Sequence, residues 1–191
     1  MTPNDNTVNM ERRPYHHGDL RAALIAEGLR LLATRDADAL SLHEVARGVG
    51  VSATSVYRHF PDKEALMTAL AVEGLKQFGI NQRLASEAAG GGEAGFSATG
   101  RAYVRFALDH PALFRLIFAS PALGTNCAPD RVGESEAGAL LLANAARMAR
   151  EDGSEAHVRA VRSWALVHGL AMLMLDGQIP VYLDLIDRAI S

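Results

Sequence analysis

The sequence predicts an all-α fold of about nine helices, and three observations support this fold class. Apolar residues recur at the 3.6-residue spacing of an amphipathic helix in successive segments, whereas no segment shows the sustained alternation of a half-buried strand. Hydrophobic residues make up 49% of the 191 positions, which is enough to fill a core. Glycine, proline and capping residues divide the chain into lengths that suit helices.

Composition excludes several classes of protein. The single cysteine, Cys127, excludes a disulfide scaffold and a site with several cysteine ligands, and no metal or other cofactor is expected. No apolar run reaches the roughly 18 residues that cross a bilayer, because His168 and Gly169 interrupt the longest candidate. The first residues lack the apolar segment of a signal peptide, so we expect a cytoplasmic protein with no membrane partner. The net charge of −3 by itself argues weakly against nucleic-acid binding.

Local signals predict the first three helices. Apolar spacing indicates a helix over residues 19–34. Ser41 and Glu44 form a capping box for a second helix, which Gly50 is expected to end in a left-handed turn. Ser52 then caps a short third helix.

A longer fourth helix is expected to start at Asp62 and to run to about Ala88, before the flexible run Gly90–Gly92. Pro111 suits the first turn of a later helix. The remaining helices are expected at residues 96–109, 111–118, 134–151, 154–176 and 180–190, with a loop at 120–133.

The second and third helices have the lengths, and the tight glycine-containing turn, of a helix-turn-helix. In this motif the first helix braces a second one, whose N-terminal end enters the major groove of DNA and must carry small or polar groups. The third helix offers such groups at Ser52, Ala53, Thr54 and Ser55. Side chains that can bind phosphate stand around them, namely Tyr57, Arg58, His59 and Lys63. The pattern therefore predicts a surface for double-stranded DNA.

The run from Val51 to Leu66 resembles the signature of the tetracycline-repressor (TetR) family of transcriptional regulators. The resemblance implies that Tyr57 and His59 contact phosphates of the operator, and that Lys63 does so from the start of the fourth helix. It also implies that Ser41 caps the second helix and touches the DNA backbone.

The resemblance is detailed over the DNA-binding domain and holds in outline for the helical remainder. The expected parts are a disordered tail at 1–13, a helix-turn-helix domain at 14–78 and a regulatory and dimerisation domain at 79–191. The chain departs from the family pattern at Thr54 and Ser55, where relatives often have Gly and Thr, so relatives do not supply the operator sequence. From Glu11 to Lys63 there are eight basic and seven acidic side chains, so affinity for DNA must come from a few placed contacts.

The C-terminal part contains a Trp-x-x-x-His-Gly arrangement, at Trp164, His168 and Gly169, that resembles a subgroup of TetR-like proteins with a WHG-type C-terminal domain. Helical spacing places Trp164 and His168 on one face. Trp164 suits a core anchor, with a pocket wall as the alternative. His168 suits a buried core position and a ligand pocket equally well, and a lone histidine gives no metal site.

A pocket between the C-terminal helices is expected to bind a small effector, because helical bundles commonly bind small molecules there. Few charged residues fall among the apolar positions, so the effector should be largely apolar, with Tyr103 or His168 as a polar contact. The candidate ligand-binding residues are Tyr103, Phe106, Phe114, Phe118, Trp164, His168 and Met172. The helix over 154–176 is apolar on most sides, so the last two helices are expected to form a homodimer interface.

Together these features favour a dimeric DNA-binding transcriptional regulator, a repressor that binds a palindromic operator and is released by a small ligand. The alternative is a helical small-molecule-binding or protein-interaction module without DNA binding. An enzyme is not expected, because nothing resembles a nucleophile elbow, and the run Gly90–Gly92 lies between helices rather than after a strand.

Overall fold

The computed structural model describes residues 20–120, 123, 135–152 and 155–190. Over these residues the chain forms nine α-helices and one 3-10 turn, and it has no strand, so the all-α prediction is confirmed. The expected N-terminal tail, the loop at 120–133 and Cys127 lie mostly or wholly outside the described residues. The elements are α1 (Leu20–Leu32), η1 (Ala37–Ala39), α2 (Leu42–Val49), α3 (Ala53–Tyr57), α4 (Lys63–Ala88), α5 (Gly92–Asp109), α6 (Pro111–Ala119), α8 (Glu136–Asp152), α9 (Ala156–Leu175) and α10 (Leu183–Ala189).

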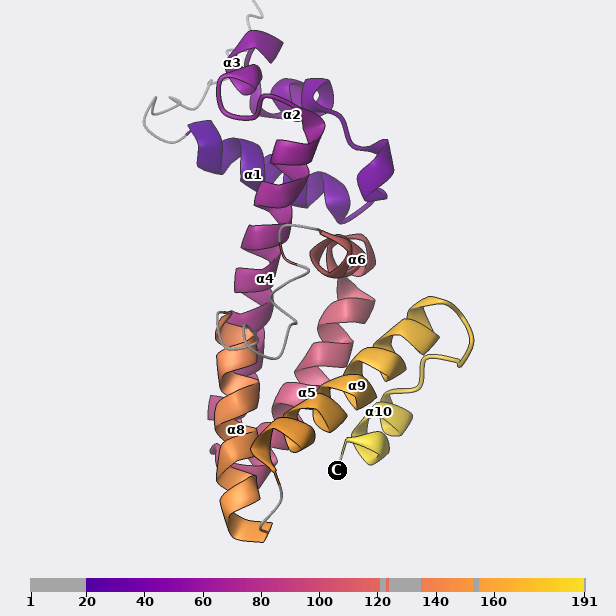
Figure 1. The fold of residues 1–191 in the computed structure, drawn as a ribbon. Coiled ribbons are helices and arrows are strands. Elements are labelled where there is room, and N and C mark those ends of the chain that lie inside the picture. Colours follow the sequence, from indigo (N-terminus) through magenta and orange to yellow (C-terminus); the bar gives the residue numbers. More distant parts are fainter. Residues whose placement is uncertain (1–19, 121–122, 124–134, 153–154, 191) are drawn as a thin grey trace, which may run out of the picture.

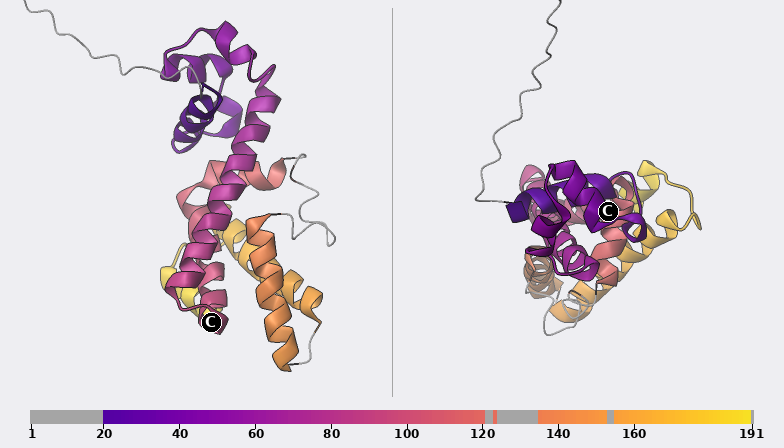
Figure 2. Two further views of the ribbon diagram at one scale, coloured as in Figure 1. Left: turned by 90° about the vertical axis from the view of Figure 1, so that its left-hand side faces the viewer. Right: turned by 90° about the horizontal axis from the view of Figure 1, so that it is seen from above.

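Helices α1, α2 and α3 gather at one end of the molecule, and the C-terminal helices gather at the other (Figure 1). Helix α4 joins the two ends, and it runs without a break past residue 78, where the expected domains meet. The view from the side shows the same division, with α8 and α9 far from α3 (Figure 2). A change in the C-terminal helices can therefore reach the N-terminal helices through α4 or through helices that touch both ends.

The capping residues act as the sequence predicts. The Ser41 hydroxyl accepts a hydrogen bond from the backbone N–H of Glu44, and the Ser52 hydroxyl accepts one from Ser55. The Asp62 carboxylate accepts one from the N–H of Ala65 at 2.8 Å and starts α4. Each bond satisfies a backbone donor that the first turn of a helix leaves unpaired. Gly50 ends α2 in the left-handed region, at φ 79°.

Two helix starts differ from the prediction. Helix α5 begins at Gly92 rather than at residue 96, because the turn at Gly90–Gly92 has positive φ throughout and the Gly91 carbonyl already accepts from the N–H of Gly95. Helix α10 begins at Leu183 rather than at Pro180, because Tyr182 is extended and acts as its N-terminal cap residue. Proline favours the first turn of a helix, but it does not by itself start one.

The N-terminal helices pack around one part of a hydrophobic core that continues into the C-terminal helices. The fully buried side chains of this part are Leu24, Leu40, Val45, Val56, Phe60, Leu66 and Leu70. Helices α1 and α4 approach closely at Gly28, where a Cβ atom would lie 2.8 Å from Cδ2 of Leu70 and 3.0 Å from its Cδ1. A side chain at residue 28 therefore has no room unless the Leu70 side chain shifts in the core or α1 moves away from α4.

Replacing Gly28 with valine is expected to lower the free energy of unfolding by about 1–3 kcal/mol, because it forces extra atoms into a packed core. Chemical denaturation monitored by circular dichroism measures the change. The matched control is Ala22→Val, which adds a β-branched side chain at an exposed position of the same helix and should cost only a few tenths of a kcal/mol. Equal stabilities of the two variants would show that α1 and α4 do not need this close approach.

The C-terminal helices pack around α5, which contacts α4, α6, α8, α9 and α10. An aromatic cluster centred on Phe78 of α4 fills the space between α4, α5 and α6. Within the described residues, α9 is the one helix long and apolar enough on average to cross a membrane, even though His168 and Gly169 interrupt its apolar run. It packs against α5 and α8, and its remaining face is exposed.

Candidate functional site

Helix α3 lies at the outer tip of the N-terminal end (Figure 1). Val56 and Phe60, which are 0% and 1% exposed, anchor the inner side of this segment in the core. The outer side carries Thr54, Tyr57 and Arg58, all exposed. A short helix that is fixed from below and polar at its outer end has the geometry needed to enter the major groove of DNA.

Several of the residues predicted to contact DNA are exposed on and after α3. Tyr57 is 46% exposed, and Arg58 and His59 follow it at the surface. The ring of His43, on α2, stands edge-on to Tyr57 with ring centroids 6.4 Å apart. No signal in the sequence marks His43, because only the packing of α2 against α3 brings these rings together.

Three of the predicted hydroxyl contacts are already engaged inside the protein. The hydroxyls of Ser52 and Ser55 lie 2.9 Å apart, and Ser41 donates to the Glu44 carboxylate at 3.1 Å. Thr54 is exposed, and no hydrogen bond from the described residues engages its hydroxyl. Thr54 is therefore the residue of this set best placed to contact a base edge through its hydroxyl or a thymine methyl through its own methyl group, while the serines mainly cap helices.

Lys63 is half-buried at the start of α4, and its Nζ donates to the backbone carbonyl of Asp38 at 2.6 Å. That carbonyl belongs to η1, so the lysine ties the start of α4 to the turn after α1. The bond leaves the positive charge of Lys63 without a carboxylate partner among the described residues. The charge therefore stays available to a phosphate.

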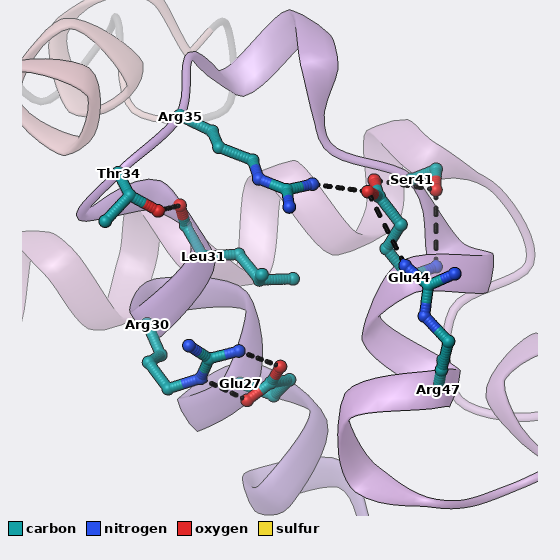
Figure 3. A network of polar contacts seen from close by, with 8 residues as sticks. All are labelled: Glu27, Arg30, Leu31, Thr34, Arg35, Ser41, Glu44 and Arg47. Atoms are coloured by element: carbon teal, nitrogen blue, oxygen red, sulfur yellow. Dashed lines mark hydrogen bonds and ion pairs between the residues drawn. The ribbon is translucent and has the colours of Figure 1, made fainter.

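Acidic side chains offset most of the other cations near the motif (Figure 3). Glu27 binds Arg30 through two hydrogen bonds of 2.7 Å, and this hydrogen bonding lowers the pKa of Glu27. Glu44 binds Arg35, whose hydrogen bond lowers the pKa of Glu44, and Arg47 lies 4.0 Å away. The basic and acidic side chains from Glu11 to Lys63 are nearly equal in number, but not every cation has an acidic partner. Arg58 and Lys63, the cations nearest α3, lie outside these ion pairs.

A second candidate site is a cavity of about 610 Å³ in the C-terminal part. Its walls come from α4, α5, α6, α8, α9 and α10, and they are mainly apolar. Four of the predicted ligand-binding residues line it, namely Tyr103, Phe118, Trp164 and His168. The other three, Phe106, Phe114 and Met172, are not among its lining residues, and Phe106 and Phe114 are buried core residues of α5 and α6.

The cavity also has polar lining residues that were not predicted from the sequence, of which Gln82 is the clearest. Its side chain is 8% exposed, and its Nε2 donates to the backbone carbonyl of Thr99 at 3.4 Å. Its Oε1 is buried without a hydrogen-bond partner in the described part of the chain. A glutamine in the middle of a long amphipathic helix gives no sequence signal that distinguishes it from a surface residue.

Three polar side chains in the cavity wall form a hydrogen-bonded series. The indole Nε1–H of Trp164 donates to the hydroxyl oxygen of Tyr103 at 3.2 Å. That hydroxyl lies 2.8 Å from Nδ1 of His168. Trp164 and His168 are both half-buried, so each serves as a cavity wall rather than as a closed core residue. Burial lowers the pKa of His168, which keeps the ring neutral at pH 7.

Acid is expected to destabilise the protein through His168. Its pKa is lower in the folded chain than in the unfolded chain, so the unfolded state takes up the proton first as the pH falls. The contribution of His168 to stability is complete above about pH 6.5 and is lost as the pH falls toward the lowered value. His168→Asn, which does not titrate, should flatten the dependence of the unfolding midpoint on pH between 7 and 5. An unchanged pH dependence in this variant would contradict the assignment.

The exposed tip of α3, braced by α2, defines the class of the molecule as a helix-turn-helix protein with a helical C-terminal part that contains a cavity. Comparison with known families agrees with this class. Residues 24–70 match the family described as bacterial regulatory proteins of the tetR family. Residues 96–190 match the tetracyclin repressor-like C-terminal domain. The chain belongs to the TetR family.

Individual relatives support the same assignment. The HTH-type transcriptional regulator Rv1816 of Mycobacterium tuberculosis is 28% identical over 151 residues, which cover 76% of this chain and 64% of that protein. The chain thus spans less than two thirds of the length of this curated relative. A solved structure of a protein of unknown function from Rhodococcus sp. RHA1 is 32% identical, with a TM-score of 0.72 and coverage of 93% and 94% of the two chains. A TetR family transcription regulator from Marinobacter aquaeolei, 21% identical over 89% and 91% of the chains with a TM-score of 0.64, shares the fold.

Proposed function

We propose that the protein is a DNA-binding transcriptional regulator that acts in the cytoplasm as a homodimeric repressor and releases its operator when a small molecule binds. The observation that carries this proposal is the tip of α3, where Thr54, Tyr57 and Arg58 are exposed above a fully buried anchor. His59 and the Lys63 ammonium add phosphate-binding groups beside it. Ala53, which is half-buried, and the capping residues Ser41, Ser52 and Ser55 complete the proposed DNA-facing surface.

The exposed face of α9 supports a dimer. Its large apolar side chains at 38–50% exposure are Val158, Val161, Leu166 and Leu173. Gly169 lies on the same face, and a Cβ atom there would meet no heavy atom of the described residues within 4 Å. Arg162 is also exposed on this face, but the part around Gly169 is apolar, and a small residue there lets a second helix approach closely, so a second copy of this chain is the proposed occupant. The segment 181–183, at the start of α10, adds further exposed apolar side chains.

Helix α6 is the proposed link between effector and DNA. Its Ile117 and Phe118 line the cavity, and the same helix contacts α1 and η1. The carbonyl of Asp38 in η1 accepts the hydrogen bond of Lys63. A ligand that displaces α6 would therefore shift the N-terminal helices of each subunit. The two copies of α3 must lie about 34–36 Å apart to enter successive major grooves, so a modest shift is enough to lower operator affinity.

Selection of bound DNA from a random pool tests the proposal with the purified full chain. The expected result is a palindrome whose half-sites lie one helical turn, or a small multiple of it, apart. Recovery of no enriched sequence, from protein that is folded and dimeric, would favour the alternative of a helical binding module that does not bind DNA.

A further inference from the structure

Helices α4 and α5 pack against each other in opposite directions, and Gln82 lies in the middle of their contact. Three pairs of residues mark successive turns of this contact, namely Phe78 with Tyr103, Gln82 with Thr99, and Ser86 with Gly95. At the last pair the helices approach so closely that a Cβ atom on Gly95 would lie 2.7 Å from the Ser86 hydroxyl oxygen. Gln82 and Thr99 both line the cavity, so their layer of the contact forms part of the cavity wall.

The orientation of the Gln82 amide follows from the group that it faces. Nε2 lies 3.4 Å from the backbone carbonyl oxygen of Thr99, and the opposite orientation would set two acceptors against each other. The Thr99 hydroxyl donates at 2.6 Å to the carbonyl of Phe96 in its own helix, so it is not a donor for Oε1. Oε1 is therefore left as a buried acceptor without a partner among the described residues.

A buried amide oxygen that lacks a donor is unfavourable, and native structures seldom keep one unless another molecule supplies the missing hydrogen bond. Gln82 is 8% exposed, and the side chains that line the cavity one and two turns earlier on α4, Phe78 and Leu75, are apolar. Oε1 is shielded where it lies, but the bond to Thr99 is long and the glutamine side chain has three rotatable torsions. The tip of the side chain can therefore turn toward a ligand in the cavity.

We infer that the cavity binds a mainly apolar ligand with an uncharged hydrogen-bond donor, a hydroxyl or an amide N–H, and that Oε1 of Gln82 accepts its hydrogen bond. An ammonium group is disfavoured, because its charge would be buried beside an amide that carries none. The inference rests on the proposed effector cavity, and it does not depend on DNA binding.

Ligand selectivity is tested with two matched pairs of probes, in which fluorine replaces a hydroxyl group at nearly constant shape. The pairs are 1-decanol with 1-fluorodecane, and 4-hydroxybiphenyl with 4-fluorobiphenyl. Fluorine cannot donate a hydrogen bond, and the fluoride is the more apolar member, so a purely apolar cavity would favour it. Titration calorimetry of the wild-type chain without DNA should show at least one hydroxyl compound binding about fivefold to tenfold more tightly than its fluoride.

The two ways in which this titration can fail are distinguishable. Fluorides that bind as tightly as their hydroxyl partners in both pairs would overturn the inference and leave the effector cavity in place. No binding of either hydroxyl compound up to its solubility limit would overturn the inference and count against the effector cavity as well.

Two variants on α4 separate Gln82 from the other polar groups of the wall. Methionine is unbranched and close to glutamine in size, but it has no amide. Gln82→Met should lose the preference for the hydroxyl compound, whereas Gln77→Met, at an exposed position of the same helix, should keep it. The affinity for 2-decanone, which accepts hydrogen bonds but donates none, should change less than twofold in Gln82→Met. A preference that survives in Gln82→Met, or a ketone affinity that falls together with that of the alcohol, would contradict Oε1 as the acceptor.

Thermal unfolding without ligand separates a ligand contact from a structural role of the amide. Because Oε1 has no donor among the described residues, Gln82→Met should unfold at the temperature of the wild type or above it, as measured by circular dichroism. A marked drop in the midpoint of Gln82→Met, with Gln77→Met unchanged, would show that the protein itself satisfies the amide, and the inference would be overturned.

Discussion

Replacing Tyr57 and Lys63 together with alanine is expected to lower operator affinity by at least ~100-fold while the fold and the dimer remain intact. Both side chains are proposed to contact DNA phosphates, and in the proposed dimer the double substitution removes four such contacts. The fold should tolerate the change, because Tyr57 is 46% exposed and Lys63 makes one bond, to the Asp38 carbonyl. Fluorescence anisotropy with the operator selected from the random pool measures the affinity.

The control for this variant is Lys76→Ala. Lys76 and Lys63 are the two lysines of the chain, and both lie on α4, but Lys76 is about 20 Å further along the helix. Lys76→Ala should leave the affinity within about twofold of wild type. Lys63→Ala alone should also reduce the slope of log affinity against log salt by about two, one for each subunit. Wild-type affinity in the double variant would refute the phosphate contacts.

The parts of the fold that the sequence predicts best are those set by residues within one helical turn of each other. Ser41, Gly50, Ser52 and Asp62 each act on a backbone group at most four residues away. Their structural roles therefore do not depend on how the helices later pack. The helix-turn-helix consists almost entirely of such local signals, which is why its limits and its exposed residues could be predicted closely.

The cavity could be predicted only in part, because helical spacing does not distinguish a side chain that faces a cavity from one that faces a packed neighbour. Tyr103 and Phe106 are both buried on α5, but only Tyr103 lines the cavity. The links between Lys63 and Asp38, and between His43 and Tyr57, were not foreseen for a related reason. Each joins two elements whose relative position is fixed only when the core of the N-terminal helices forms.

Replacing Gly169 with arginine is expected to convert the proposed dimer to a folded monomer and to lower operator affinity by more than ~100-fold. The isolated chain has room for the new side chain, because a Cβ atom at this position meets no described heavy atom within 4 Å. Arginine is also a better helix former than glycine, by roughly 0.5–1 kcal/mol, so α9 itself should not weaken. Sedimentation velocity measures the oligomeric state, and thermal unfolding at low protein concentration checks the fold of the monomer.

The expected loss of affinity follows from the geometry of a palindromic site. A monomer can occupy only one half-site, so it loses the contribution of the second α3 and the phosphate contacts around it. Gly169→Ala is the control, because it also removes the glycine but adds only a methyl group. The methyl group leaves space for a partner helix, so this variant should preserve most of the dimer. If Gly169→Arg stays dimeric and still binds the operator, the exposed face of α9 is not where two copies of the chain meet. The exposed apolar residues 181–183 would then be the next surface to substitute.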